Sequence, residues 1–204
     1  MKLYNNRPSP YGRKVLAVAH EKQLLDRIEV IQLDPWSDPP ELVAATPLGK
    51  VPALITDDNT LITESTLIAE YFDVIGSGAK LLGTDRLSTL RQTALAQGLI
   101  DAASALVIER RRPVDRQWEA WSVRQRRAIE RTLTKTTMPD GFDLAGITLA
   151  CGLAYLDFRL TEIAWRSFHP DLAGWLDEVA QRPSMQATRA NSVPMESEFA
   201  LVVF

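Results

Sequence analysis

The sequence predicts an α/β domain followed by an all-α domain, and three observations carry that prediction. Up to about residue 76, short β-branched runs alternate with segments whose apolar residues recur at helical spacing. After residue 85, long helical patterns follow and strand-like runs disappear until the very end of the chain. The glycine-containing stretch between the two patterns is typical of a linker. We therefore divide the chain of 204 residues into segments 1–76, 77–84 and 85–204.

The first domain is predicted to have the order β-α-β-α-β-β-α, an α/β sandwich with a mixed sheet. Its first helix has clear start signals, because Ser9 is a good N-cap and Pro10 falls at the first helical position, where a missing N–H costs nothing. Gly76 stops its last helix. The predicted strands cover 2–4, 28–33, 52–56 and 60–62, and the predicted helices cover 10–22, 39–45 and 65–75.

The second domain is predicted to be a bundle of helices. Asp85 is expected to cap a long helix at its start. Asp143 is expected to cap an almost wholly apolar helix, and a helix that is apolar all round belongs at the centre of a bundle. The predicted helices cover 85–112, 115–137, 143–158, 170–181 and 183–190.

Composition excludes several classes of protein. An apolar share of 46% and a charged share of 24% are ordinary for a soluble globular protein. A net charge of −3 argues against general affinity for nucleic acid or anionic membranes. No run approaches the length of a membrane span, and the first residues lack the apolar segment of a signal peptide. We therefore expect a cytoplasmic protein.

Residues suited to metal binding or redox chemistry are few. Cys151 is the single cysteine, which excludes an internal disulfide, and its place in the apolar helix predicts core packing. With only His20 and His169 as histidines, we expect no zinc site and no metal cofactor.

The stretch around Val51 and Pro52 is unusual for a strand. Proline has no N–H to give to a ladder, so at the start of a strand it belongs at an edge or a bend. A cis bond before Pro52 would turn the backbone N–H and C=O of Val51 outward, where an extended peptide could pair with them. Further along, Glu64 and Ser65 open a helix whose first N–H groups lack partners, which is a natural seat for a carboxylate.

Five motifs in order carry a family resemblance that covers essentially the whole chain. They are Ser9 to Val15, Thr46 to Pro52, Thr63-Glu64-Ser65 with Ile68 to Tyr71, Leu149-Ala150-Cys151, and Arg182-Pro183-Ser184. Together they resemble the cytosolic glutathione transferase family, in particular its bacterial members with serine at the active helix. The resemblance implies a thioredoxin-like N-terminal domain that binds glutathione and an all-α domain that contributes the acceptor pocket. It also implies a homodimer joined by the helices after the linker.

By this resemblance Ser9 would be the catalytic residue. Its hydroxyl, at the positive end of a helix, would donate a hydrogen bond to the glutathione sulfur and favour the nucleophilic thiolate over the thiol. The alternative is that Ser9 is only an N-cap whose oxygen is engaged with the backbone. Tyr4 and Asn6 are the other candidate partners of the thiol, although Tyr4 fits the core of its strand better.

The resemblance also implies the residues that hold glutathione. Val51 would pair through its backbone with the cysteinyl part, with Pro52 in cis beside it. Ser65 and Glu64 would hold the carboxylate and the ammonium of the γ-glutamyl end, and Lys50 would pair with the glycyl carboxylate. The alternatives are helix capping by Ser65 with Glu64 in solvent, and a plain exposed lysine in a turn.

Two residues are predicted in the acceptor pocket, Tyr11 at the first helix and Arg111 in a basic stretch. Residues 107–135 hold nine Lys or Arg and four Asp or Glu. This stretch is either a solvated helix face or a rim that attracts acidic or electron-poor acceptors. One departure from the family pattern is Gly146, at the position where the family carries the acidic partner of a reciprocal capping box.

The activity that the resemblance implies is that of a glutathione S-transferase, with glutathione as co-substrate and a small electrophile as acceptor. Peroxide reduction or isomerisation with glutathione would use the same site. A transferase-fold protein that binds or scaffolds without catalysis is the alternative of another class. Serine in place of cysteine at position 9 argues against thiol–disulfide exchange.

Overall fold

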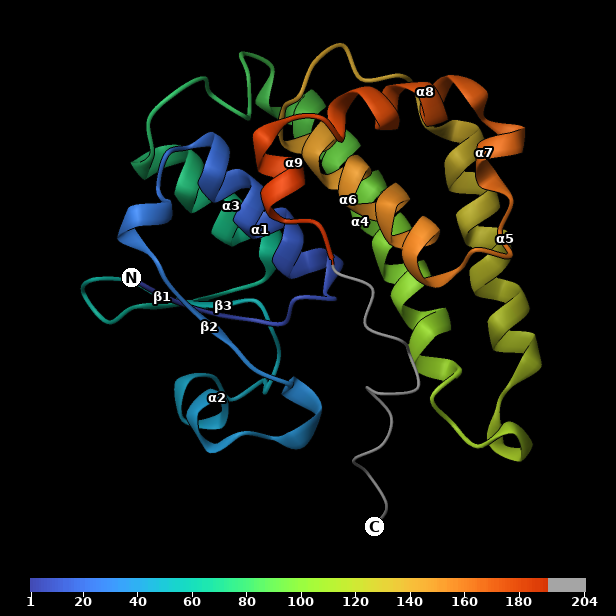
Figure 1. The fold of residues 1–204 in the computed structure, drawn as a ribbon, viewed down its shortest axis with the longest axis horizontal. Helices are drawn as coiled ribbons and strands as arrows, with labels where there is room; N and C mark the ends of the chain where they lie inside the picture. The colour runs from blue at the N-terminus through green and yellow to red at the C-terminus, as the bar shows by residue number, and fades with distance from the viewer. Residues whose placement is uncertain (191–204) are drawn as a thin grey trace.

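The computed structural model describes residues 1–190, which begin with a four-stranded mixed sheet (Figure 1). Its strands are β1 (Lys2–Asn5), β2 (Glu29–Gln32), β3 (Ala53–Ile55) and β4 (Leu61–Thr63), in the spatial order β2-β1-β3-β4. β1 is parallel to β2, and β3 is antiparallel to both β1 and β4. The parallel pair needs a crossover, which helix α1 (Pro10–Glu21) supplies.

Helices cover both faces of this sheet. α1 and α3 (Ser65–Ile75) pack against each other on one face, and α2 (Pro40–Ala45) lies on the other (Figure 1). Two 3₁₀ turns, η1 (Leu25–Arg27) and η2 (Pro35–Ser37), flank β2. The predicted order of strands and helices is confirmed, because each lies within one residue of its expected bounds.

After α3, every regular element of the described chain is helical. The helices are α4 (Arg86–Glu109), α5 (Glu119–Lys135), α6 (Leu144–Arg159), α7 (Trp165–Phe168), α8 (Pro170–Val179) and α9 (Pro183–Ala187), with the 3₁₀ turn η3 (Val114–Arg116) before α5. No helix among residues 1–190 is long and apolar enough to cross a membrane.

Three details of the predicted bundle are wrong or incomplete. The helix expected from residue 115 begins only at Glu119, because Trp118 is extended and its N–H donates to the Glu109 carboxylate at 2.8 Å. The short helix α7 has no counterpart in the prediction. The helix expected over 183–190 ends at Ala187, and the strand-like run at the very end of the chain lies outside the described residues.

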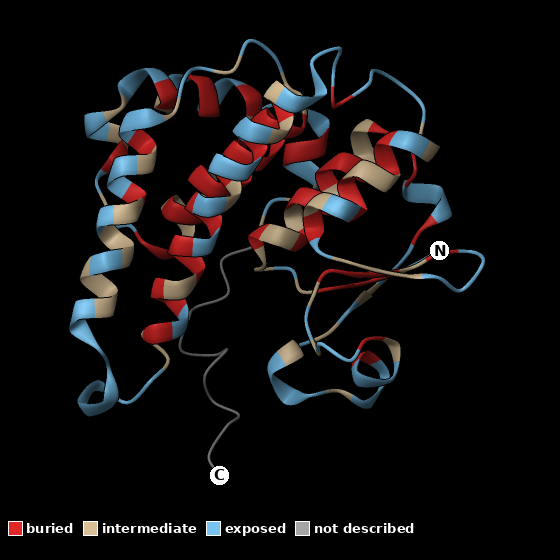
Figure 2. Cartoon of the chain, turned by 180° about the vertical axis from the view of Figure 1, so that it is seen from behind, coloured by how far each residue is buried: buried red, intermediate tan, exposed pale blue. Residues whose placement is uncertain are grey.

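α6 is the central helix of the molecule, as predicted. It packs against α4, α8 and also α1, so it joins the two domains, and buried residues gather where the helices meet (Figure 2). Cys151 on α6 is fully buried, which confirms its core role. Asp143 caps the helix by accepting the Gly146 N–H at 2.9 Å. A Cβ at Gly146 would lie 2.9 Å from the Gly141 carbonyl, so an acidic partner does not fit there.

Candidate active site

The N-terminus of α1 is capped by Ser9. Its Oγ accepts the Gly12 N–H at 3.2 Å, and its own backbone N–H donates to the Asn6 carbonyl at 2.9 Å. A serine hydroxyl has two acceptor lone pairs and one donor proton. Capping therefore occupies a lone pair and leaves the O–H of Ser9 to donate elsewhere. The two roles that the sequence set against each other are compatible.

Asn5 and Gly12 fit together under the first turn of α1. Asn5 is 1% exposed, and a Cβ at Gly12 would lie 1.8 Å from its Oδ1, so only glycine leaves room for this amide. Neither polar atom of the Asn5 side chain has a hydrogen-bond partner among the described residues. The close approach brings the end of β1 directly against the helix that Ser9 begins.

The two other candidate partners of a thiol are engaged within the protein. Tyr4 is buried against Leu42 and Ala53, which confirms the core role expected for it. The Asn6 amide donates to the Leu33 carbonyl at 3.0 Å, so it tethers the loop after β2.

The Val51–Pro52 peptide bond is cis, as predicted. Val51 precedes β3, whose pairing with β1 begins at Ala53. Within residues 1–190, neither the N–H nor the C=O of Val51 makes a backbone hydrogen bond. Lys50 beside it is exposed and makes no ion pair with the part of the chain that the structure describes.

The first turn of α3 differs from the prediction, because its N–H groups have a partner. The Glu64 carboxylate accepts the Thr66 N–H at 3.0 Å and the Leu67 N–H at 3.1 Å, and the Ser65 hydroxyl donates to it at 3.2 Å. Glu64 itself, at φ 73°, is the N-cap. Its neighbour Ser65 is buried. The expected seat for a ligand carboxylate thus holds a carboxylate of the protein's own.

The charge of Glu64 is well supported at this helix end. Burial alone would raise its pKa, but the hydrogen bonds from Thr66 and Leu67 and the nearby charge of Lys14 together lower it. A lowered pKa keeps Glu64 ionised at neutral pH, when it offsets the partial positive charge of the helix.

Lys14 is a site residue that the sequence prediction missed. Its side chain is fully buried, and its Nζ donates to Thr66 Oγ1 at 3.0 Å and to Gln97 Oε1 at 2.7 Å. Burial lowers the pKa of Lys14 to about 8, against the opposing charge of Glu64. The signal in the sequence was a lysine four residues before Val18, inside the apolar stripe of the first helix.

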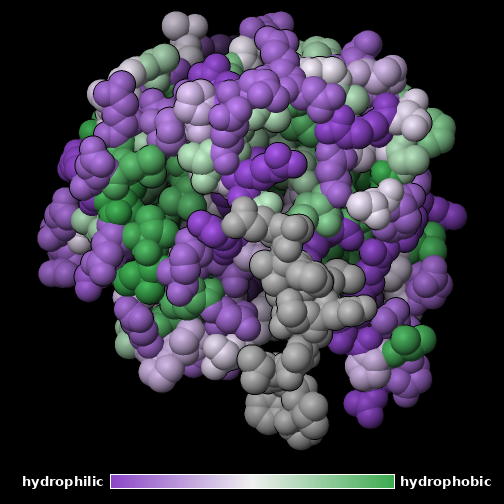
Figure 3. Space-filling model, viewed as in Figure 1, coloured by the Kyte–Doolittle hydropathy of each residue, from purple (hydrophilic) through white to green (hydrophobic). Residues whose placement is uncertain are grey.

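A cavity of about 1020 Å³ lies beside Ser9, between the start of α1 and the helices α6 to α9. Hydrophilic side chains predominate on this face of the molecule, as Figure 3 shows. Ser9 and Arg13 contribute to the wall from the first domain, and Tyr155 and Phe158 contribute from α6. The cavity is therefore built by residues from both domains.

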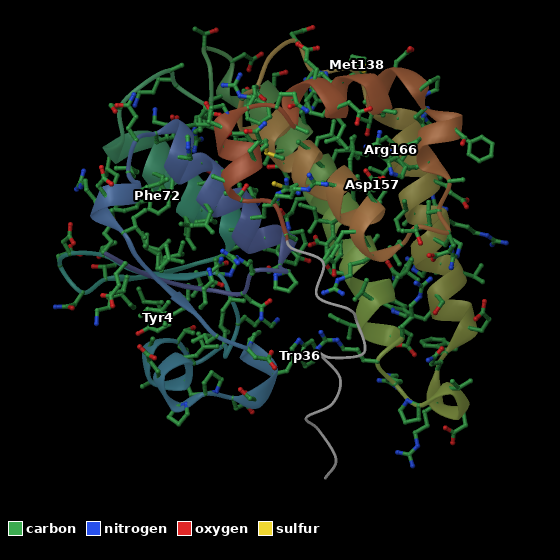
Figure 4. The ribbon with its side chains drawn as sticks, viewed as in Figure 1. Tyr4, Trp36, Phe72, Met138, Asp157 and Arg166 are labelled. Carbon is green, nitrogen blue, oxygen red and sulfur yellow. The ribbon has the colours of Figure 1, made fainter. Side chains whose placement is uncertain are left out.

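Neither Tyr11 nor Arg111 is part of this wall. The Tyr11 hydroxyl donates to Asp101 on α4 at 2.8 Å, and burial raises the pKa of this phenol. The Arg111 guanidinium lies 4.5 Å from the ring centroid of Trp36, so it joins the end of α4 to η2, where Trp36 projects from the first domain (Figure 4). Their assignment to an acceptor pocket stays a prediction.

An α/β domain with a cis-proline before its third strand and two capped helix ends beside an all-α bundle is the architecture of the cytosolic glutathione transferases. The family model of the glutathione S-transferase N-terminal domain matches residues 8–75. The GST-like protein YibF of Escherichia coli K12 is 33% identical, over 92% of this chain and 98% of its own. The chain belongs to the glutathione S-transferase family.

Solved structures agree with this assignment. A glutathione transferase family member from Pseudomonas fluorescens Pf-5, with bound glutathione, is 38% identical over 94% of this chain and 99% of its own, with a TM-score of 0.87. A glutathione S-transferase from Methylobacillus flagellatus KT, also with glutathione bound, is 33% identical over 93% of this chain and 99% of its own, with a TM-score of 0.85.

Proposed function

We propose that the protein is a glutathione S-transferase in which the Ser9 hydroxyl donates a hydrogen bond to the glutathione sulfur. One observation carries the proposal. Ser9 uses a lone pair to cap α1, retains its proton for a ligand, and lies on the wall of the 1020 Å³ cavity. A hydrogen bond to the charged form of a thiol lowers its pKa, and the positive end of α1 acts in the same direction.

The reaction follows from that placement. The glutathione thiol loses its proton to solvent, and the thiolate forms a carbon–sulfur bond with the acceptor, whose leaving group departs with the bonding electron pair. Holding both reactants in one cavity converts a bimolecular encounter into an oriented one, which supplies much of the rate.

Residues of the first domain would hold the glutathione backbone. Val51 has its N–H and C=O available to pair with the cysteinyl part, as one strand pairs with another. The N–H groups at the start of α3 and the Ser65 hydroxyl would bind the γ-glutamyl carboxylate. Lys14 would support this charge from beside them, because it is hydrogen-bonded to the Thr66 side chain in the same turn. Glu64 would then turn to the γ-glutamyl ammonium, and Lys50 would meet the glycyl carboxylate. Two relatives, from Pseudomonas fluorescens and Methylobacillus flagellatus, are known with glutathione bound.

Conjugation fits the site better than thiol–disulfide exchange. Position 9 carries serine, and the single cysteine, Cys151, is fully buried with a pKa that burial raises. A buried thiol with a raised pKa is a poor nucleophile. Reduction of peroxides or isomerisation by the same thiolate would place no further demand on these residues.

We further propose that the protein is a cytoplasmic homodimer joined by α4, the first helix after the linker, to which α3 before the linker adds apolar surface. Arg86 on α4 forms an ion pair with Glu70 on α3, so the two helices are neighbours at this point. Large apolar side chains on them are exposed, namely Leu67, Val74, Leu87 and Leu95. Exposed apolar residues on adjacent helices favour burial against a second copy. Val74→Glu should give a monomer in analytical ultracentrifugation, and an unchanged dimer would move the interface elsewhere.

Calorimetric titration with glutathione tests the proposed binding site. We expect saturable binding to the wild type and a loss of about tenfold or more in affinity for Ser65→Ala, because a hydrogen bond to a charged group is worth about 1.5–3 kcal/mol. Adding Glu64→Ala should abolish the remaining binding at the γ-glutamyl end. Ser122→Ala, on α5, is the matched control. A folded wild type that does not bind glutathione would refute the proposal and favour a scaffolding role.

A further inference from the structure

The cavity beside Ser9 has an unequal set of charged residues. Four arginines line it, from the loop before α1, from α1, from α7 and from the segment after α9, against two aspartates. Arg166 on α7 engages both aspartates. It donates to Asp157 at 2.7 to 3.1 Å and to Asp177 at 3.0 Å, and Figure 4 shows Asp157 and Arg166 side by side. Both carboxylates of the cavity wall are therefore already paired with Arg166.

Arg7, Arg13 and Arg189 have no carboxylate partner among residues 1–190. Arg7 and Arg189 are exposed at the rim of the cavity. Arg13 is half-buried, and one of its Nη atoms donates to the Met185 carbonyl at 3.2 Å. Its Nε is buried without an acceptor in the described chain. A guanidinium keeps its charge at any physiological pH, so the cavity carries an excess of fixed positive charge.

The same wall has an apolar side. Phe158 and Leu176 face the cavity, together with Met185. An acceptor with a flat or aliphatic body and one anionic group would therefore satisfy both parts of the wall. A carboxylate would gain charge-assisted hydrogen bonds from the Arg13 guanidinium, and a neutral acceptor would not.

We propose that the acceptor for this cavity is an electrophile that carries a carboxylate, with Arg13 as its main contact and Arg7 and Arg189 at the rim. This inference rests on the proposed function, because it places the glutathione sulfur at Ser9 in the same cavity. The carboxylate takes no part in bond formation. It orients the acceptor so that its electrophilic carbon meets the sulfur, and paired N–H···O bonds from a guanidinium suit that task.

Two matched acceptors test the inference with the full-length protein. In 4-chloro-3-nitrobenzoate and 4-chloro-3-nitrobenzamide, a carbon–sulfur bond replaces the carbon–chlorine bond and chloride leaves with the electron pair. For each compound, kcat/KM is divided by the rate constant of its uncatalysed reaction with glutathione. We expect this normalised value to favour the benzoate by about tenfold or more in the wild type, and the preference to fall toward one in Arg13→Gln.

Controls separate charge recognition from other effects. Both acceptors use the same thiolate, so a change in thiol pKa cancels in the ratio. Arg112→Gln removes an arginine that pairs with Glu109 outside the cavity, and it should leave the ratio unchanged. Because Arg13 also ties α1 to α9 through the Met185 carbonyl, Arg189→Gln serves as the second variant, with a smaller loss of preference expected.

A binding readout makes the two proposals fail separately. Calorimetry compares 3-nitrobenzoate with 3-nitrobenzamide on protein saturated with S-methylglutathione. Equal or weaker binding of the benzoate would overturn the inference, whatever the turnover. Preferred binding of the benzoate that depends on Arg13, without conjugation of either chloro compound, would support carboxylate recognition and refute the transferase reaction.

Discussion

Two helices of the first domain begin at the candidate site, and their first turns are capped in different ways. At α1 the cap is the neutral hydroxyl of Ser9, which opens on the cavity. At α3 the cap is the carboxylate of Glu64, which occupies the first N–H groups, and the buried cation Lys14 is attached to the same turn through Thr66. Each helix begins with four N–H groups that lack helical partners. A neutral group caps them at α1, and a charged group caps them at α3.

The difference indicates what each helix end can accept. A neutral cap leaves the partial positive charge of α1 available to an anion that is formed in place, as a thiolate is. An ionic cap has already offset the charge of α3, so an incoming carboxylate there must exchange with Glu64 and draw on Lys14. The start of α1 is therefore suited to a group that becomes ionised when it is bound, such as a thiol. The start of α3 is suited to a group that is always charged, such as a carboxylate.

The largest effect is expected when the hydroxyl of Ser9 is removed. Ser9→Ala deletes a hydrogen bond to a thiolate, worth about 1.5–3 kcal/mol, and should raise the pKa of bound glutathione by about one to two units. At neutral pH, kcat/KM should fall about 10- to 100-fold. The ultraviolet absorbance of the thiolate, followed against pH in the complex, measures the pKa directly.

Ser9→Thr is the control, because threonine keeps both the cap and the hydroxyl. A Ser9→Ala protein that melts at a lower temperature but binds glutathione with an unchanged thiol pKa would reduce Ser9 to a structural cap.

A change at the start of α3 should alter the affinity for glutathione and leave the pKa of its thiol unchanged. Lys14→Met removes the cation linked to the first turn of α3, and we expect about tenfold weaker binding of S-methylglutathione. This ligand has no thiol, so its calorimetric titration isolates the γ-glutamyl end. Lys2→Met, at an exposed position on β1, controls for the loss of charge. A shift in the thiol pKa with no change in affinity would contradict the division of roles.

The smallest effect concerns stability. The pKa of Lys14 is lowered to about 8 in the folded protein, so between that value and its ordinary value the unfolded chain binds more protons. The free energy of unfolding should therefore rise with pH above about pH 8, by roughly 1 kcal/mol per unit from this group. Urea unfolding at about pH 8 and pH 9.5 checks the slope. Lys14→Met should lose this increment, and an equal slope in both proteins would show that Lys14 does not titrate there.

Much of the fold was predictable because its boundaries carry local signals. Ser9 and Pro10 begin α1, Asp143 begins α6, and Gly76 ends α3, as each residue type predicts. Pro52 at the start of a strand predicted an edge or a bend, and the family resemblance implied the cis bond that the structure has. These features depend on neighbours within a few positions.

The contents of the site were less predictable because they depend on distant partners. Glu64 caps α3 at positive φ, a conformation that its residue type does not suggest, and Ser65 was the better capping candidate by type. Lys14 falls inside the apolar stripe of the first helix, but its partner Gln97 lies on a helix of the other domain, so the contact has no local signal. The cavity joins the start of α1 to helices about 150 residues later, which is why no pattern in the chain outlined it.

The close fit between Asn5 and Gly12 restricts which substitutions these two positions can accept. Because a Cβ at position 12 meets the Asn5 amide at 1.8 Å, a side chain at position 12 is tolerable only after position 5 becomes smaller. A library randomised at position 12 alone should return glycine almost without exception. A library randomised at both positions should also return pairs with a small residue at position 5 and a larger one at position 12. Substitutions at the two positions are therefore coupled, and position 5 must change before position 12 can accept a side chain.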